Sequence, residues 1–194
     1  MTHNKDHSGQ RPMSWMLFHI MLLTMNIRKR FRNIDEEISL AEIKSGDYIL
    51  DFGCGPGFNT IPAAQKTGPD GRIFALDLSP QAINIVKKKA ARYQLENIET
   101  IHSGCHTHLQ DKSIDLVLLH NTLPLIKEKQ KVLDEIGRVL KKGGKLSYMS
   151  RAGSRVCSRL YGKDSISDSS VKKILKYDYN LIYDVDGHLI FERN

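Results

Sequence analysis

Apolar and polar positions in residues 46–194 follow two different spacings. Short apolar runs that end at glycine or aspartate predict buried strands at 48–52, 72–76, 98–101, 114–119 and 145–149. Between these runs, apolar residues recur every three or four positions. That spacing predicts helices at 59–66, after the capping residue Ser79, and at 128–140. The lysine and glycine run KKGG at 141–144 predicts a turn.

The last part of the chain breaks this alternation. A helix is predicted at 167–176, and two apolar runs, 180–183 and 188–191, then flank Asp186-Gly187. Asp-Gly between two such runs is typical of a β-hairpin. Strands that alternate with helices favour a parallel sheet with helices on both faces. We therefore predict an α/β fold, a Rossmann-like doubly wound sheet that is mostly parallel and ends in a C-terminal antiparallel hairpin.

The pattern predicts one such domain at 46–194 and an N-terminal helical extension at 1–45, of which 1–11 is polar and expected to be disordered. Residues 13–27 are apolar but are interrupted by His19, Thr24 and Asn26. The stretch lacks a small-residue cleavage site and is shorter than the ~20 apolar residues of a membrane span. We expect no signal peptide and no transmembrane segment. A lid over an acceptor pocket, a homodimer interface and a membrane-surface helix stay open as its role.

The composition indicates the cellular compartment and the kind of partner. The three cysteines, Cys54, Cys105 and Cys157, are odd in number and widely spaced, which indicates a reducing, cytoplasmic environment. The formal net charge of +7 raises the expectation of an anionic partner. Basic residues concentrate at 28–32 and 127–145, and a solvated helix face explains the second group. Nucleic acid is therefore a possible partner but not the favoured one.

A glycine-rich loop carries the first chemical signal. Asp51 ends the first predicted strand, and Gly53, Gly55 and Gly57 follow directly before a helix. Glycines allow a sharp turn and a close approach to a ligand, which in such sheets binds at the carboxyl ends of the strands. The third glycine comes one residue too early for the dinucleotide pattern G-x-G-x-x-G. A carboxylate before the loop also suits a cation better than a pyrophosphate.

A second carboxylate supports a nucleoside ligand. Asp77 ends the second predicted strand, twenty residues after Gly57. A carboxylate at this place can accept hydrogen bonds from two ribose hydroxyls. S-adenosylmethionine combines a ribose with an ammonium and a sulfonium group, so the loop and Asp77 together favour this cofactor.

Four segments resemble the class I S-adenosylmethionine-dependent methyltransferases, particularly the branch with ubiquinone- and menaquinone-biosynthesis enzymes. They are DFGCGPG at 51–57, ALDLSPQAI at 75–83, SIDLVLLHNTLPLI at 113–126 and EIGRVLKKGGKLSYMS at 135–150. The resemblance covers about residues 43–149. It implies that Asp51 lies near the methionine ammonium and that Asp77 holds the ribose. It further implies cofactor contacts from Gly53, Cys54, Gly55, Gly57, Leu78 beside the adenine, and the backbone of His120.

One departure concerns the adenine. Where the family usually has Gly-Asp-Ala, with the aspartate on the adenine amino group, this chain has Gly104-Cys105-His106. Because a thiol is a weak acceptor, His106 or a backbone carbonyl near Cys105 is expected to take over. His102 and His108 lie close in sequence, but the stretch lacks a C-x-x-C pair and falls in the adenine loop. We expect no metal site.

The resemblance implies in-line displacement of the methyl group onto a small-molecule acceptor, and the methionine-rich apolar stretch at 13–27 fits a hydrophobic one. Positioning alone supplies ~7–11 kcal/mol of such a barrier, so no dedicated catalytic residue is required. If the acceptor carries a proton, His120 is the expected general base, with Asn121 and Tyr148 as orienting residues.

Other functions stay open on the sequence alone. A nicotinamide-dinucleotide oxidoreductase would share the sheet and the acidic residue. A catalytically weak module that binds the cofactor or RNA would share the whole fold. Methylation of the adenine amino group is disfavoured, because 121–124 reads Asn-Thr-Leu-Pro and lacks the aromatic residue of those enzymes.

Overall fold

The computed structural model describes residues 38–150 and 166–194 of the 194-residue chain. The strands and helices of the parallel part are β1 (Tyr48–Phe52), α3 (Thr60–Thr67), β2 (Arg72–Asp77), α4 (Pro80–Arg92), β3 (Ile98–His102), β4 (Ile114–His120), η1 (Leu123–Leu125), α5 (Lys129–Val139) and β5 (Leu140–Met149). They are followed by α7 (Asp168–Leu175), β6 (Tyr179–Val185) and β7 (His188–Arg193).

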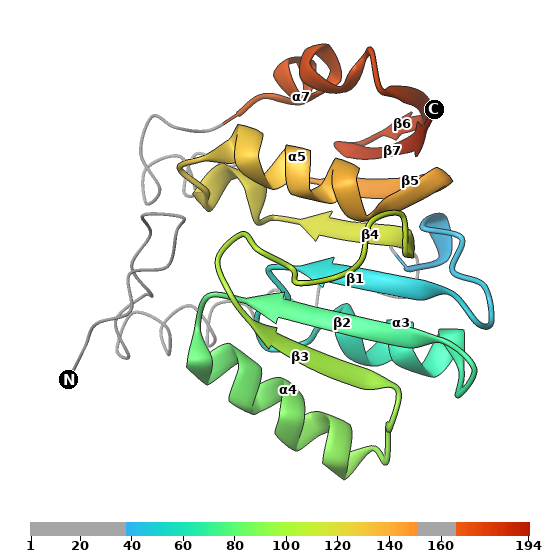
Figure 1. Cartoon of the computed structure of the whole chain (residues 1–194), viewed down its shortest axis with the longest axis vertical. Coiled ribbons are helices and arrows are strands. Elements are labelled where there is room, and N and C mark those ends of the chain that lie inside the picture. Colours follow the sequence, from blue (N-terminus) through green and yellow to red (C-terminus); the bar gives the residue numbers. More distant parts are fainter. Residues whose placement is uncertain (1–37, 151–165) are drawn as a thin grey trace.

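Seven strands form one sheet in the order β3-β2-β1-β4-β5-β7-β6 (Figure 1). The first five strands are parallel, whereas β7 pairs antiparallel with both β5 and β6. This confirms the predicted fold class. The chain leaves β1 toward β2 and β3 and then returns to β4, so the direction of winding reverses between β1 and β4. Ligands bind at this point in open α/β sheets, at the carboxyl ends of the strands.

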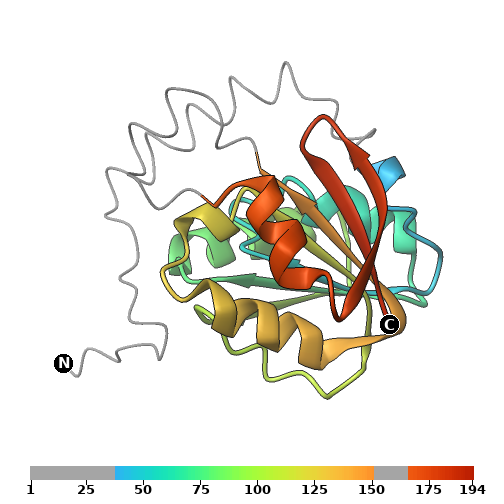
Figure 2. The ribbon, with the colours of Figure 1, turned by 90° about the horizontal axis from the view of Figure 1, so that it is seen from above.

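Helices cover both faces of the sheet. Residues 38–43 and α3 pack on the face of Ile49 and Ile73, and α4 packs beside them on Ala75. The opposite face carries Leu50 and Phe74 and is covered by α5 and α7. The β6–β7 hairpin and α7 together close the β5 end of the sheet (Figures 1 and 2). The central strands β1, β2 and β4 are thus buried on both sides, as expected for a parallel sheet, whereas β3 and β6 at the two edges are largely exposed or half-buried.

The predicted turn at 141–144 is wrong in one respect. The run KKGG lies within β5, which begins at Leu140 rather than at Lys145. Ile114 pairs with Leu140, and Leu116 pairs with Lys145, so the extra residues form a bulge with Gly143 at φ +74°. A bulge keeps both ends of the strand paired while it re-aims the chain.

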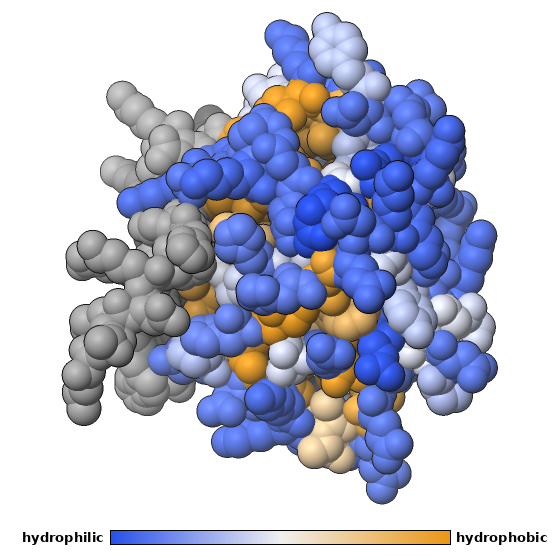
Figure 3. Space-filling model, in the orientation of Figure 1, coloured by the Kyte–Doolittle hydropathy of each residue, from blue (hydrophilic) through white to orange (hydrophobic). Residues whose placement is uncertain are grey.

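Most of the N-terminal part lies outside the described residues, including the apolar stretch 13–27 with its three alternative roles as a lid, a dimer interface or a membrane-surface helix. In the part of the chain that is described, no helix is long and apolar enough to cross a membrane. The face that carries α5 is mostly hydrophilic, with small apolar areas between charged side chains (Figure 3).

The hairpin turn is as predicted, with Asp186 at φ +50° and Gly187 at φ +76°. We expect Gly187→Ala to lower the unfolding free energy by about 1–2 kcal/mol, because alanine is strained in the left-handed region. Gly137→Ala in α5 is the matched control. Its added Cβ would only reach ordinary contact, 3.5 Å from the Tyr179 hydroxyl, so we expect a neutral or stabilising effect. Equal losses in urea denaturation would contradict this account of the turn.

Candidate functional site

The glycine loop crosses the carboxyl ends of β1 and β2. The Leu76 carbonyl accepts the N–H groups of Gly53 and Cys54, at 2.8 and 2.9 Å. Gly53 is at φ +75°, and an added Cβ there would lie 2.3 Å from Thr122. The Thr122 hydroxyl contacts the carbonyls of Gly53 and His120, at 3.4 and 3.1 Å. The segment after β4 is therefore tied directly to the loop, and only glycine fits between them.

Gly55 faces open space. It is at φ +52°, and an added Cβ would meet no atom within 4 Å. Gly57, in contrast, approaches Val86 of α4, where an added Cβ would come within 3.1 Å. The loop thus packs closely at Gly53 and Gly57 and leaves room above Gly55, which is the shape of a cradle for a ligand.

Asp51 lies at the base of this cradle and is 2% exposed. Its Oδ2 accepts a hydrogen bond from the Thr60 hydroxyl at 2.6 Å. Burial raises the pKa of Asp51 to about 7, and the nearby Asp77 carboxylate adds to this rise, whereas the Thr60 bond opposes it. A cation placed beside Asp51 would favour its ionised form.

Asp77 holds the loop from the end of β2. Its two oxygens accept the N–H groups of Gly55 and Ser79, each at 2.8 Å. Burial raises its pKa, while these two backbone bonds lower it. Because each carboxylate oxygen accepts two hydrogen bonds, both retain capacity for a further donor such as a ribose hydroxyl.

His120 is buried at the end of β4 on the same sheet face as Asp51, whose neighbour in the β1–β4 register is Leu118. Its Nδ1 lies 3.2 Å from the Asn59 side-chain amide, and its Nε2 lies 2.9 Å from the Ser147 hydroxyl. Ser147 in turn lies 2.8 Å from Nε2 of His188 on β7. Four polar side chains from the α3 cap, β4, β5 and β7 thus form one buried chain.

The two residues that we expected to act beside His120, Asn121 and Tyr148, lie in different surroundings. Asn121 is half-buried at φ +57°, and its N–H donates to the Met149 carbonyl at 2.7 Å. Tyr148 belongs to the core on the opposite sheet face, where burial raises its pKa to about 12. Ser147, its neighbour on β5, therefore contacts His120 in the place that we expected for Tyr148, because successive strand residues point to opposite faces.

Few side chains line the part of the site where we expect the adenine. The Leu78 carbonyl lies 3.0 Å from His102 Nε2, and Leu78 itself is half-buried. Cys105 is buried in the same core as Phe52, whereas His106 is exposed. The Cys105 side chain thus faces the core, and the backbone and His106 are what this loop can offer a base. Within residues 38–150 and 166–194, no three His, Cys, Asp or Glu side chains are grouped as metal ligands.

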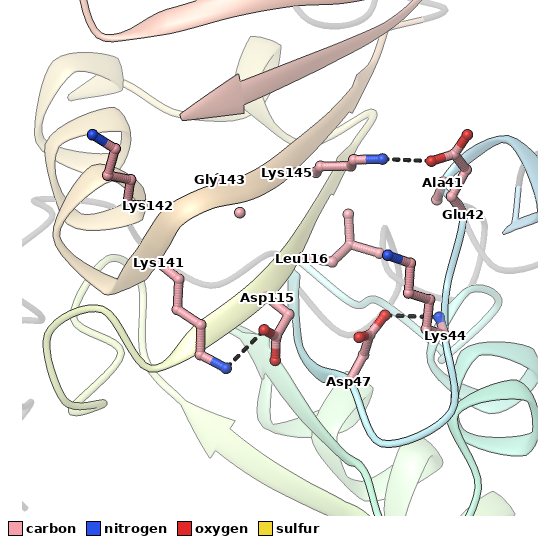
Figure 4. A pocket seen from close by; sticks show the side chains of 11 residues that line it. Ala41, Glu42, Lys44, Asp47, Asp115, Leu116, Lys141, Lys142, Gly143 and Lys145 are labelled. Atoms are coloured by element: carbon pink, nitrogen blue, oxygen red, sulfur yellow. Dashed lines mark hydrogen bonds and ion pairs between the residues drawn. The ribbon is translucent and has the colours of Figure 1, made fainter. Parts of the chain in front are cut away.

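A hollow of about 150 Å³ lies at the other edge of the sheet, between the β5 bulge and residues 41–47 (Figure 4). Its charged side chains largely neutralise one another. Lys141 pairs with Asp115 at 2.7 Å, Lys145 pairs with Glu42, and Asp47 accepts the Lys44 N–H at 2.7 Å. The hollow lacks the uncompensated buried charge of the carboxyl edge, so we place the functional site at the glycine loop.

Comparison with known proteins agrees with this placement. A family model described as a methyltransferase domain matches residues 43–177. The chain belongs to this family. An arsenite methyltransferase of Halobacterium salinarum is 34% identical over 110 residues, which are 56% of this chain and 28% of that protein. A demethylmenaquinone methyltransferase of Lactobacillus johnsonii is 34% identical over 110 residues, 45% of its length.

The solved structures agree in fold. A SAM-dependent methyltransferase from Aquifex aeolicus has a TM-score of 0.72 at 22% identity, covering 86% of this chain and 90% of that one. The chain spans less than half the length of the curated relatives named above. The family assignment establishes S-adenosylmethionine as the cofactor and removes the oxidoreductase alternative.

The geometry of this methyltransferase domain fits that cofactor. The space over Gly55 would receive its methionine portion, and the two carboxylates offer partners for an ammonium and for ribose hydroxyls. When bound, S-adenosylmethionine supplies a methyl group on a sulfonium sulfur, a good leaving group that becomes neutral.

Sequence reasoning missed five residues that shape the site: Asn59, Thr60, Thr122, Ser147 and His188. Asn59 and Thr60 directly follow the glycine loop, so their position was an available signal. Ser147 and His188 are single polar residues within apolar strand runs. Such residues need a buried partner, but the sequence does not say which one.

The raised pKa of Asp51 predicts that cofactor binding depends on pH. This pKa leaves Asp51 largely protonated below pH 7, so binding of a cation must release that proton. We expect affinity for S-adenosylmethionine to fall by up to about tenfold per pH unit below 7. Calorimetry at pH 6 in two buffers of different ionisation enthalpy measures the protons released.

Asp51→Asn is the control, because the titration of the cofactor's own amino group remains. We expect this variant to bind more weakly at pH 8 and to lose the Asp51 share of the proton release. We also expect it to unfold at higher temperature than wild type at pH 8, where ionisation of the buried carboxyl disfavours the folded state. Equal proton release in both proteins would contradict the assignment.

The position of Asp77 predicts that its substitution lowers the affinity for the cofactor. Asp77→Asn should weaken S-adenosylmethionine binding by about 10- to 100-fold, because hydrogen bonds to a charged group contribute about 1.5–3 kcal/mol. Asp70→Asn, in the exposed turn after α3, is the matched control and should bind as wild type. Unchanged affinity in Asp77→Asn would show that this carboxylate only holds the loop.

Proposed function

We propose that this chain transfers the methyl group of S-adenosylmethionine to a small, apolar acceptor whose nucleophile carries a proton, and that His120 removes this proton. The supporting observation is the ring of His120, which is 7% exposed and fixed on both nitrogens beside the glycine loop. A surface histidine would need no such partners, whereas a general base must be held in one orientation.

The orientation of the ring supports this role. With the Asn59 amide nitrogen as donor, His120 Nδ1 is an acceptor and presents its lone pair toward the start of α3. At 3.2 Å, this bond is longer than the 2.9 Å bond on the other side of the ring. The Asn59 Oδ1 atom is buried without a hydrogen-bond partner in the described structure. The amide is thus incompletely satisfied, and an acceptor hydroxyl can replace it at Nδ1.

The cysteines favour one class of acceptor. The named relatives act on arsenite or on demethylmenaquinone. A soft metalloid prefers thiolate ligands. Cys54 and Cys105 are 6% and 4% exposed, and burial raises the pKa of the Cys54 thiol well above its usual value. Within the described residues these thiols do not form a metalloid site, so we favour a hydroxylated aromatic ring, as in a reduced quinone.

The same thiols support a cytoplasmic setting. Cys54 and Cys105 are both reduced. Buried thiols that form no disulfide are typical of proteins in a reducing compartment.

Replacement of His120 tests the proposed chemistry. Transfer of a labelled methyl group would be measured with a reduced naphthoquinone, arsenite plus a thiol reductant, and a small amine as acceptors. We expect the reduced quinone to be methylated, and His120→Ala to lower kcat by about 10²–10⁴-fold, as for the loss of a general base. Affinity for S-adenosylmethionine, measured by calorimetry, should change little.

His108→Asn is the matched control. His108 is exposed at φ +57°, a conformation that asparagine tolerates, so this variant should turn over as wild type. Unchanged kcat in His120→Ala would rule out the base. Methylation of arsenite alone would overturn the acceptor class.

A further inference from the structure

The series of buried polar side chains at His120 continues along the same face of the sheet, across β5 to β7 and away from the glycine loop. Ser147 is fully buried on β5, and His188 is 5% exposed on β7. The Ser147 hydroxyl bridges the two imidazoles, at 2.9 Å to His120 and 2.8 Å to His188. The rings themselves meet edge to face, with centroids 5.5 Å apart. Burying two imidazoles around one hydroxyl costs desolvation free energy, which an apolar contact would avoid, so the arrangement points to more than a structural role.

One assignment of the histidine tautomers gives this series of hydrogen bonds a single direction. With Asn59 as donor to His120 Nδ1, the Nε2–H of His120 donates to Ser147, and the Ser147 hydroxyl donates to Nε2 of His188. Each group thus donates to the next, and the chain has an acceptor nitrogen at its far end. A chain with this polarity can pass a proton from His120 to His188 by shifting each hydrogen by one bond.

We propose that Ser147 and His188 are positioning residues that draw the acceptor's proton away from His120, so that the two imidazoles share one proton. The inference rests on the proposed function of His120 as the base. Ser147 contributes the bridge, and His188 contributes the nitrogen on which the proton ends.

The proton transfer balances along the chain. The acceptor's proton forms an N–H bond at Nδ1 of His120, and the proton on Nε2 leaves for the Ser147 oxygen. Ser147 gives its original proton to Nε2 of His188. Ser147 ends with one proton as before, His120 ends neutral, and the positive charge lies on His188, two strands away from His120 in the sheet.

The groups around the pair favour one positive charge but not two. Asp51 on β1 lies on the same sheet face as His120, and the Tyr183 ring of β6 lies 5.9 Å from that of His188. Asp168 of α7 approaches Gly187, next to His188, and Lys172 pairs with Asp184 on β6. Because like charges repel at this distance, the pair should titrate in two separated steps.

Histidine side-chain NMR on the labelled protein without acceptor tests the sharing directly. We expect the His120 and His188 rings of the wild type to titrate together, in two steps at least about one pH unit apart, as coupled sites do. In His188→Gln the remaining His120 ring should titrate in a single step, whereas in Ser147→Ala the two rings should still repel each other but can no longer share the proton through the hydroxyl. Gln keeps a hydrogen-bonding group near the position of Nε2 but cannot hold the proton. Independent titration of the two rings in the wild type would overturn the proposal.

Steady-state kinetics, measured with the acceptor that the wild type methylates, provide the second readout. We expect His188→Gln to lower kcat by about 10- to 100-fold, less than loss of the base itself, with KM and cofactor affinity unchanged. The apparent pKa of kcat/KM should shift with it, which a purely structural role would not cause. A wild-type pH profile in His188→Gln would contradict the relay, and this variant decides if Ser147→Ala does not fold.

The two proposals can fail separately. If the rings share a proton but no acceptor in the panel is methylated, the coupling stands and the acceptor class is wrong. If His120→Ala abolishes turnover while His188→Gln behaves as wild type, the base stands and the relay is wrong. His108→Asn again serves as the matched histidine control.

Discussion

The placement of two carboxylates around one glycine loop, with Asp51 buried and Asp77 half-buried, is the constraint on which the rest of the site depends. Asp51 and Asp77 end neighbouring strands, and desolvation raises the pKa of both. No lysine or arginine within the described residues pairs with either of them. Buried negative charge without a counter-ion is unfavourable, and a bound cation relieves that cost. The two carboxylates therefore favour a cationic ligand at this loop, and the cofactor of this family carries positive charges.

The glycine loop is held in shape by the same groups that we propose to bind the cofactor. Asp77 accepts the Gly55 N–H, and the Leu76 carbonyl holds Gly53 and Cys54. Thr122 then joins this loop to the end of β4, where His120 begins the acceptor side. We therefore expect a substitution at any of these positions to change cofactor binding and the placement of His120 together. This coupling explains why the cofactor residues and the proposed base lie so close along one sheet edge.

Most of the fold and half of the site could be predicted from the sequence. Apolar runs and glycines locate the strands, and Asp51 and Asp77 are recognisable because each ends such a run beside a turn. His188 could not be found this way, because its contact with Ser147 spans 41 positions and depends on the register Met149–His188 of β5 and β7. The choice of Tyr148 over Ser147 failed for a related reason. Side chains alternate between faces along β5, so an error of one position moves a residue to the other side of the sheet.

The two edges of the sheet use charge in opposite ways, which separates stability from function. At the amino edge, Lys141 and Lys145 pair with carboxylates. Arg138 on α5 also pairs with Asp111 and Glu135. Burial would raise the pKa of Glu135, but its hydrogen bonds from Arg138 and Thr107 lower it to about 2, so this group stays ionised. These basic groups of α5 and β5 thus lie on a surface where they already have carboxylate partners. Such a surface attracts a polyanion only weakly, because paired charges largely cancel at a distance. This contrast supports our proposal that the acceptor is selected at the carboxyl edge, where Asp51, His120 and His188 are buried.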